Sequence, residues 1–247
     1  MPAPIWRDGL ALLREPGFAR LFAARLISAA GSAMTPIALP FAVLDDLGGR
    51  PSQVGLLIAA GSLTQVAMQL FAGALADRGS RRRQMIGADL LAAGAQGAIA
   101  ILLLSGHATF GALLALHALC GVTFALHFPA AVGLVPLVVE RDRLQAANAL
   151  LSIAQATAFA VGATAAGILA ATAGAGFALA IDAASFAASA LLVAGIRPSE
   201  QLRSQGTSFL RELREGFREF TAHTWLWTIV LQFTFMLMAW FGAWAVL

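Results

Sequence analysis

The chain has 247 residues, of which 59% are apolar and only 12% are charged. Soluble domains carry roughly 25% charged residues, so this composition leaves too few charges to cover a surface in water and indicates a membrane protein. The net charge of +3 is carried by arginines at the ends of apolar runs, not in an aromatic-interleaved patch, which argues against nucleic acid as a partner.

Two uncharged runs come first along the chain. One lies between Arg25 and Asp45, and the next lies between Arg50 and Asp77. A helix advances about 1.5 Å per residue, so about 20 apolar residues cross a hydrocarbon core about 30 Å thick. Each run therefore predicts one membrane-spanning helix, and the abundance of Ala and Leu favours helix over strand.

Two longer runs follow, at 84–139 and 144–196, and each is interrupted by a single acid. Each is long enough for two spans, with turns expected at 105–108 and near 172–176. One more apolar run follows residue 223. The sequence thus predicts seven spanning helices, near residues 22–44, 52–76, 84–105, 109–139, 144–171, 176–196 and 224–247.

The arginines predict the orientation of these spans. They gather in alternate segments, whereas the intervening loops hold only Arg50. Because loops rich in Arg stay in the cytoplasm, we expect the amino terminus and residues 197–223 on the cytoplasmic side of a bacterial inner membrane. The arginines concerned are Arg7, Arg14, Arg20, Arg25, Arg78, Arg81, Arg82, Arg83, Arg141, Arg143, Arg197, Arg203, Arg211, Arg214 and Arg218.

Residues 208–221 differ from the spans. Phe209, Leu213, Phe217 and Phe220 recur at three- and four-residue spacing, with Arg and Glu between them. This spacing predicts an amphipathic helix. Such a helix suits a linker lying on the cytoplasmic face of the membrane, and the alternative is a helix that binds a partner.

A short motif joins the second and third predicted spans. Residues 73–82 read Gly-Ala-Leu-Ala-Asp-Arg-Gly-Ser-Arg-Arg. This stretch resembles a loop motif of the major facilitator superfamily, and six spans followed by a linker and a seventh span match the architecture of that family. The resemblance implies an all-α membrane protein with a six-helix transmembrane bundle at 1–200, a cytoplasmic amphipathic linker at 201–223, and a first helix of a second half at 224–247.

Two further stretches are similar to one branch of this family, the bacterial exporters that include siderophore and macrolide efflux proteins. Residues 141–150 read Arg-Asp-Arg-Leu-Gln-Ala-Ala-Asn-Ala-Leu, and residues 180–186 read Ala-Ile-Asp-Ala-Ala-Ser-Phe. The resemblance implies efflux of a small molecule by alternating access, driven by a proton gradient and without a cofactor. Uptake through the same architecture is the alternative.

The family's fold has two six-helix halves, with the substrate path between them. Seven spans correspond to one half and one further helix. We therefore expect the sequence to be part of a longer transporter whose carboxyl-terminal half is missing. The alternative is a truncated membrane protein that transports nothing or acts as a scaffold.

The loop motif implies a gating role for Gly73, Asp77, Arg78, Arg81 and Arg82. In this role Asp77 stabilises the outward-facing state by meeting the end of a helix in the other half, where an acid contributes about 0.3–1 kcal/mol. The alternative is an acid at the membrane interface that pairs with Arg81 or Arg82.

Polar residues within the spans are candidates for a proton or substrate path. Asp182 lies deep in the sixth predicted span, where an acid is expected to be functional. Asp89 lies near the start of the third, where it can also pair with the loop arginines. His117 stands where many drug antiporters of this family carry Arg, and imidazole exchanges protons near neutral pH. Three amides either face the path or bond across helices, namely Gln65, Gln69 and Gln155.

The sequence predicts neither an enzyme nor a metalloprotein. It contains no nucleophile-elbow, metalloprotease or phosphate-binding motif. His117 and His127 have no carboxylate or cysteine at ligand spacing, and Cys120 is the only cysteine. The expected partners are therefore the lipid bilayer and a small-molecule substrate.

Overall fold

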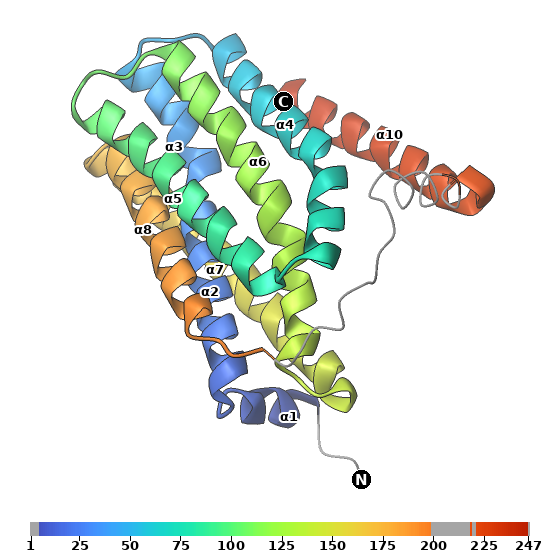
Figure 1. Ribbon diagram of the computed structural model, residues 1–247. Helices are drawn as coiled ribbons and strands as arrows, with labels where there is room; N and C mark the ends of the chain where they lie inside the picture. Colours follow the sequence, from blue (N-terminus) through green and yellow to red (C-terminus); the bar gives the residue numbers. More distant parts are fainter. Residues whose placement is uncertain (1–4, 199–217, 219–220, 247) are drawn as a thin grey trace. The chain divides into compact units, whose positions relative to one another are not determined.

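The structure is a computed structural model that describes residues 5–198, 218 and 221–246. The chain divides into two compact units, Met1–Arg203 and Ser204–Leu247. In the described residues every regular element is helical (Figure 1). The prediction of an all-α protein is confirmed.

The first unit is a bundle of helices joined by short turns. Its α-helices are α1 (Ile5–Leu12), α2 (Pro16–Ser32), α3 (Thr35–Phe41), α4 (Pro51–Arg78), α5 (Arg81–Leu104), α6 (Phe110–Leu134), α7 (Leu144–Thr172) and α8 (Ala175–Ala194). The predicted turns are where the sequence puts them, with positive backbone φ angles at Gly106 and Gly174. Glycine adopts this conformation without steric cost.

Within the described residues, five segments are long and apolar enough to cross a membrane. The other two predicted spans fall on α4 and on α10 (Thr224–Val246), which include residues whose side chains are not described. The helix α4 has 28 residues, and a shorter apolar stretch, Thr224–Phe233, lies in α10. The five segments are Pro16–Asp46, Arg81–Leu104, Phe110–Leu137, Arg141–Thr172 and Ala175–Ala194.

The first span is divided, whereas the sequence predicts one span near 22–44. It begins earlier, at Pro16, and the helix is interrupted between Ser32 and Thr35. The cause is Pro36, which has no N–H to donate to the carbonyl of Ser32. The second piece ends in a π-helical turn, Ala42–Asp46. The division places Thr35 at the start of a new helix, in the middle of the span.

Apolar side chains cover the outside of the bundle as well as its inside. Leu63, Ile101 and Leu191 are 70%, 68% and 76% exposed, as expected for side chains that face lipid. Two buried apolar clusters fill the two ends of the bundle. One includes Phe18 and Met85, and the other lies around the opposite helix ends, with Met34, Leu57 and Ile99 among its members.

Small residues allow the helices to approach closely. A Cβ atom at Gly121 of α6 would lie 2.1 Å from the carbonyl oxygen of Gly61 in α4. A Cβ atom at Gly162 of α7 would lie 2.0 Å from the carbonyl oxygen of Ala30 in α2. Backbone approach of this kind holds membrane helices together, because lipid offers no hydrophobic drive for their association.

The second unit is described mainly through α10, which is apolar along its length. The amphipathic helix expected at 208–221 falls almost wholly outside the described residues. The boundaries 1–200, 201–223 and 224–247 stay predictions.

We predict that Gly162→Ala destabilises the bundle, because the added methyl group overlaps the backbone of Ala30 and overpacking costs about 1–3 kcal/mol. The matched control is Gly167→Ala on the same helix, where no atom lies within 4 Å of the added Cβ. Thermal unfolding of both variants in detergent tests this. Equal melting temperatures for the two would contradict the packing argument.

Candidate functional site

A cavity of about 780 Å³ lies in the first unit, between the two apolar clusters. Its wall is formed by α2 to α8 and is mostly apolar, with four phenylalanines and a small number of polar side chains. This combination is typical of a small-molecule binding site. The polar residues with long or ionisable side chains are Arg25, Gln65, Gln96, His117, His127, Gln155 and Asp182.

Asp182 of α8 is fully buried and holds three helices together. Its Oδ2 accepts hydrogen bonds from Thr35 Oγ1 of α3 at 2.8 Å and from Gln96 Nε2 of α5 at 2.7 Å. Its Oδ1 lies 3.5 Å from the hydroxyl of Ser185. Gly31 of α2 has no side chain to block this cluster, since a Cβ there would lie 2.8 Å from Oδ1. Within the described residues all the hydrogen-bond partners of this carboxyl group are neutral.

Asp89 of α5 is also fully buried, in a second polar cluster. Its Oδ1 lies 2.6 Å from Nδ1 of His127 in α6, and its Oδ2 accepts a hydrogen bond from Ser189 Oγ of α8 at 2.6 Å. The sequence suggested pairing with the loop arginines, and the structure gives Asp89 other partners. The reason is depth, because Asp89 lies two helical turns inside α5 while those arginines stay at its start.

His117 lies on the cavity wall and packs against α4. A Cβ atom at Gly61 would lie 2.8 Å from its Nε2, and its Nδ1 is buried without a hydrogen-bond partner among the described residues. His127 also lines the cavity, ten residues further along α6. In the part of the chain that the structure describes, no three or more metal-binding side chains form a group.

Gln155 of α7 lines the cavity and bonds to α2. Its Oε1 accepts a hydrogen bond from Nη2 of Arg25 in α2 at 3.0 Å. Gln65 also lines the cavity, whereas Gln69 is exposed and does not. The structure thus brings Gln155, His117 and Asp182 together at one cavity, with Asp89 behind His127.

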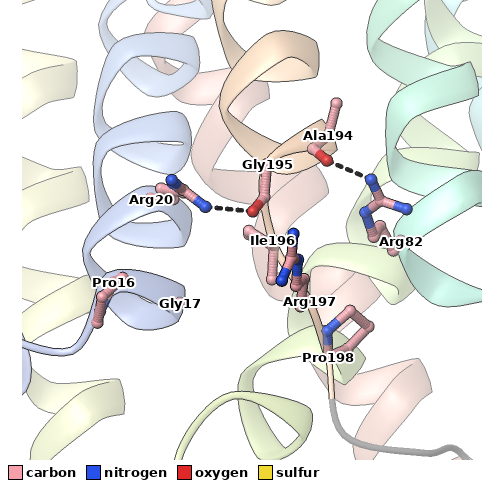
Figure 2. A pocket seen from close by; sticks show the side chains of 9 residues that line it. All are labelled: Pro16, Gly17, Arg20, Arg82, Ala194, Gly195, Ile196, Arg197 and Pro198. Carbon is pink, nitrogen blue, oxygen red and sulfur yellow. Dashed lines mark hydrogen bonds between the residues drawn. The ribbon is translucent and has the colours of Figure 1, made fainter.

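Arginines close the ends of helices at one end of the bundle. Arg81 Nη1 donates to the carbonyl of Gly133 near the end of α6, at 2.8 Å. At the end of α8, Arg82 donates to the carbonyl of Ala194 and Arg20 donates to that of Gly195 (Figure 2). Arg82 also donates to the carbonyl of Val193. The last carbonyls of a helix lack partners within it and carry partial negative charge. These arginines therefore supply both the missing donors and the matching charge.

The same contacts bring four arginine-containing segments to one end of the bundle, which we call the arginine-rich end. It includes Arg20, Arg82 and Arg197, which line a surface hollow of about 890 Å³ (Figure 2). Arg143 forms an ion pair with Glu15, in the turn between α1 and α2. The sequence predicts that these loops share one side, and the contacts agree with that prediction.

The first half of the loop motif is less fully described. Gly73 lies within α4, and a Cβ there would meet no atom within 4 Å. The side chains of Asp77 and Arg78 are outside the described residues. The gating role of Asp77 therefore stays a prediction.

Sequence reasoning missed several residues of the site. Gln96 and Thr35 are neutral residues in apolar runs, and Ser189 is a small one, so none of them gives a strong signal. The sequence indicates only an orienting role for Arg25, although this residue lines the cavity. Arg25 lies inside α2, nine residues after the helix begins at Pro16. The sequence alone does not show this position, because it does not show that the helix begins there.

The fold defines a multi-pass helical membrane protein with a cavity inside its bundle. The model of the Major Facilitator Superfamily matches residues 21–247. The chain therefore belongs to the Major Facilitator Superfamily, and it is a membrane transporter rather than an enzyme. A comparison with curated proteins found no match.

We predict that Asp89→Ala lowers the free energy of unfolding by about 3 kcal/mol, because it deprives the buried Ser189 and the half-buried His127 of their partner. Asp142→Ala is the control, since it removes an exposed acid from the turn before α7. Denaturant unfolding in detergent measures both. An Asp89 variant as stable as the Asp142 variant would show that the buried cluster contributes nothing.

Proposed function

We propose that the protein is a proton-coupled exporter of small organic molecules that works by alternating access, in the branch that resembles siderophore and macrolide exporters. The observation that carries this proposal is Asp182, a fully buried acid in the cavity wall whose partners are neutral. An ionisable group at membrane depth that lacks a counter-ion is typical of proton carriers.

The hydrogen bonds of Asp182 explain how a proton would change the bundle. The ionised carboxylate accepts from Thr35 and Gln96, and hydrogen bonds to a charged acceptor are roughly twice as strong as neutral ones. Protonation removes the charge and weakens both bonds. Because they join α3, α5 and α8, proton binding is linked to the packing of three helices around the cavity.

The cavity supports transport of a small molecule. Sites for small ligands measure about 300–1,000 Å³, and this one measures about 780 Å³. Its aromatic and aliphatic wall suits a partly apolar substrate. In the family's fold the second half would complete the path across from this wall.

Orientation and gating complete the proposal. The arginine-rich end lies in the cytoplasm of a bacterial inner membrane, in keeping with the positive-inside rule. The loop at 73–82 gates the cavity at that end. Support comes from Arg81 and Arg82, which tie the loop to the ends of α6 and α8, so a movement of the loop is transmitted to both helices.

We predict that Asp182→Asn abolishes transport driven by a pH gradient, because the amide keeps the shape and can accept from Thr35 but binds no proton. Exchange of substrate across vesicles without a gradient continues. The measurement is dye accumulation in inside-out vesicles, with and without a protonophore, beside Asp142→Asn as control. Two results would refute proton coupling through this acid. One is gradient-driven transport at the wild-type rate in Asp182→Asn, and the other is wild-type transport that the protonophore does not affect.

We predict that Asp77→Asn lowers transport several-fold while the protein still inserts in the membrane at wild-type level. The amide loses the charge that the partial positive end of a helix would attract. Vesicle transport and membrane-fraction blotting measure the two effects, again with Asp142→Asn as control. Unchanged transport would remove the gating role from Asp77.

A further inference from the structure

One charge on the cavity wall has no counter-ion. Arg25 is half-buried, and within the described residues its guanidinium donates one hydrogen bond, to the neutral Gln155. Its Nε is buried without a hydrogen-bond partner, and within the described part of the chain no acid pairs with its guanidinium. A guanidinium that is partly removed from water and has no anion beside it is unfavourable. An anionic ligand at this site would therefore be stabilised.

The place of Arg25 distinguishes it from the other arginines of the bundle. Arg20 and Arg82 bond the carbonyls at the end of α8, whereas Arg25 lies further inside α2 and caps no helix. Ser28 and Ser32 follow it at helical spacing and line the same cavity. Arg25 therefore belongs to a polar stripe of α2 that faces the cavity, not to the arginine-rich end.

The other charged groups of the cavity do not neutralise Arg25. Asp182 is fully buried and engaged by Thr35 and Gln96. Asp89 is fully buried behind His127. Of the charged groups on the described wall, the guanidinium is thus the one that is partly exposed to a ligand.

Aromatic side chains lie on the same wall. Phe124 and Phe128 stack with their ring centroids 6.3 Å apart, and each is 49% exposed. Phe159 and Phe186 line the cavity from α7 and α8. These rings offer a flat apolar surface, and planar aromatic ligands stack on such surfaces in an offset arrangement.

We propose that the cavity binds amphipathic organic anions, with Arg25 holding the carboxylate or sulfonate group and the phenylalanines holding an aromatic body. Arg suits this role because its planar guanidinium presents paired N–H groups to a carboxylate. Gln155 keeps the guanidinium turned toward α7 while no anion is bound. This inference names the substrate class of the proposed exporter and so rests on that function.

The direct test is equilibrium binding to the purified chain in a neutral detergent. Carboxyfluorescein and rhodamine 6G share a xanthene core and carry opposite charges, so their fluorescence anisotropy compares charge at nearly constant shape. We expect carboxyfluorescein to bind and rhodamine 6G to bind at least about tenfold more weakly. Arg25→Gln weakens carboxyfluorescein binding about tenfold, as expected for loss of a hydrogen-bonded charge, and Arg25→Lys restores part of it.

The matched control is Arg83→Gln, which removes an exposed positive charge at the start of α5, outside the cavity. It leaves carboxyfluorescein binding unchanged, and thermal unfolding verifies that each variant is folded. The inference is overturned if the wild-type protein does not bind carboxyfluorescein. It is also overturned if the wild type and Arg25→Gln bind carboxyfluorescein equally.

Transport of the two dyes in inside-out vesicles separates this inference from the proposed function. Gradient-driven accumulation of rhodamine 6G without carboxyfluorescein binding overturns the anion site and leaves the exporter in place. In the opposite case, carboxyfluorescein binds in a way that depends on Arg25, but neither dye is transported by the gradient. That result supports the anion site and refutes the exporter.

Discussion

Hydrocarbon offers no hydrogen bonds, and the rest of the structure depends on that constraint. A polar group within the bundle must find its partner in the protein or lose several kcal/mol. The two buried acids meet this need for a partner in different ways. Asp89 bonds the imidazole of His127 and the hydroxyl of Ser189, and Asp182 bonds three neutral side chains. Each acid therefore joins at least two helices, and removing either leaves partners unpaired.

The same constraint explains the helix ends. Carbonyls at the last turn of a helix have no partner within it, and in this bundle arginines provide one. Arg81 serves α6, and Arg20 and Arg82 serve α8. The basic residues of the loop motif thus have a structural role besides the gating role that we propose. Arg81 and Arg82 thus bond the start of α5 to the ends of two other helices.

Against this background Arg25 is the exception. Within the described residues its guanidinium has one neutral partner and an unpaired Nε. Natural proteins keep such unsatisfied groups mainly at functional sites, where a ligand completes them. The cavity wall therefore combines an acid that is fully engaged, Asp182, with a guanidinium that is not. That division matches a transporter in which the proton and the substrate bind to different residues.

Charge and hydropathy along the sequence determined the membrane class, the helices, the turns at 105–108 and 172–176, and the shared side of the arginine loops, because these depend only on local composition and length. They also marked Asp182 and His117 as candidates. Only the tertiary structure decided that Asp89 pairs with His127, that Thr35 and Gln96 hold Asp182, and that Arg25 faces a cavity. Those contacts join helices far apart in the chain, and which faces of two helices meet is set by close packing at residues such as Gly31 and Gly162, which no local pattern encodes.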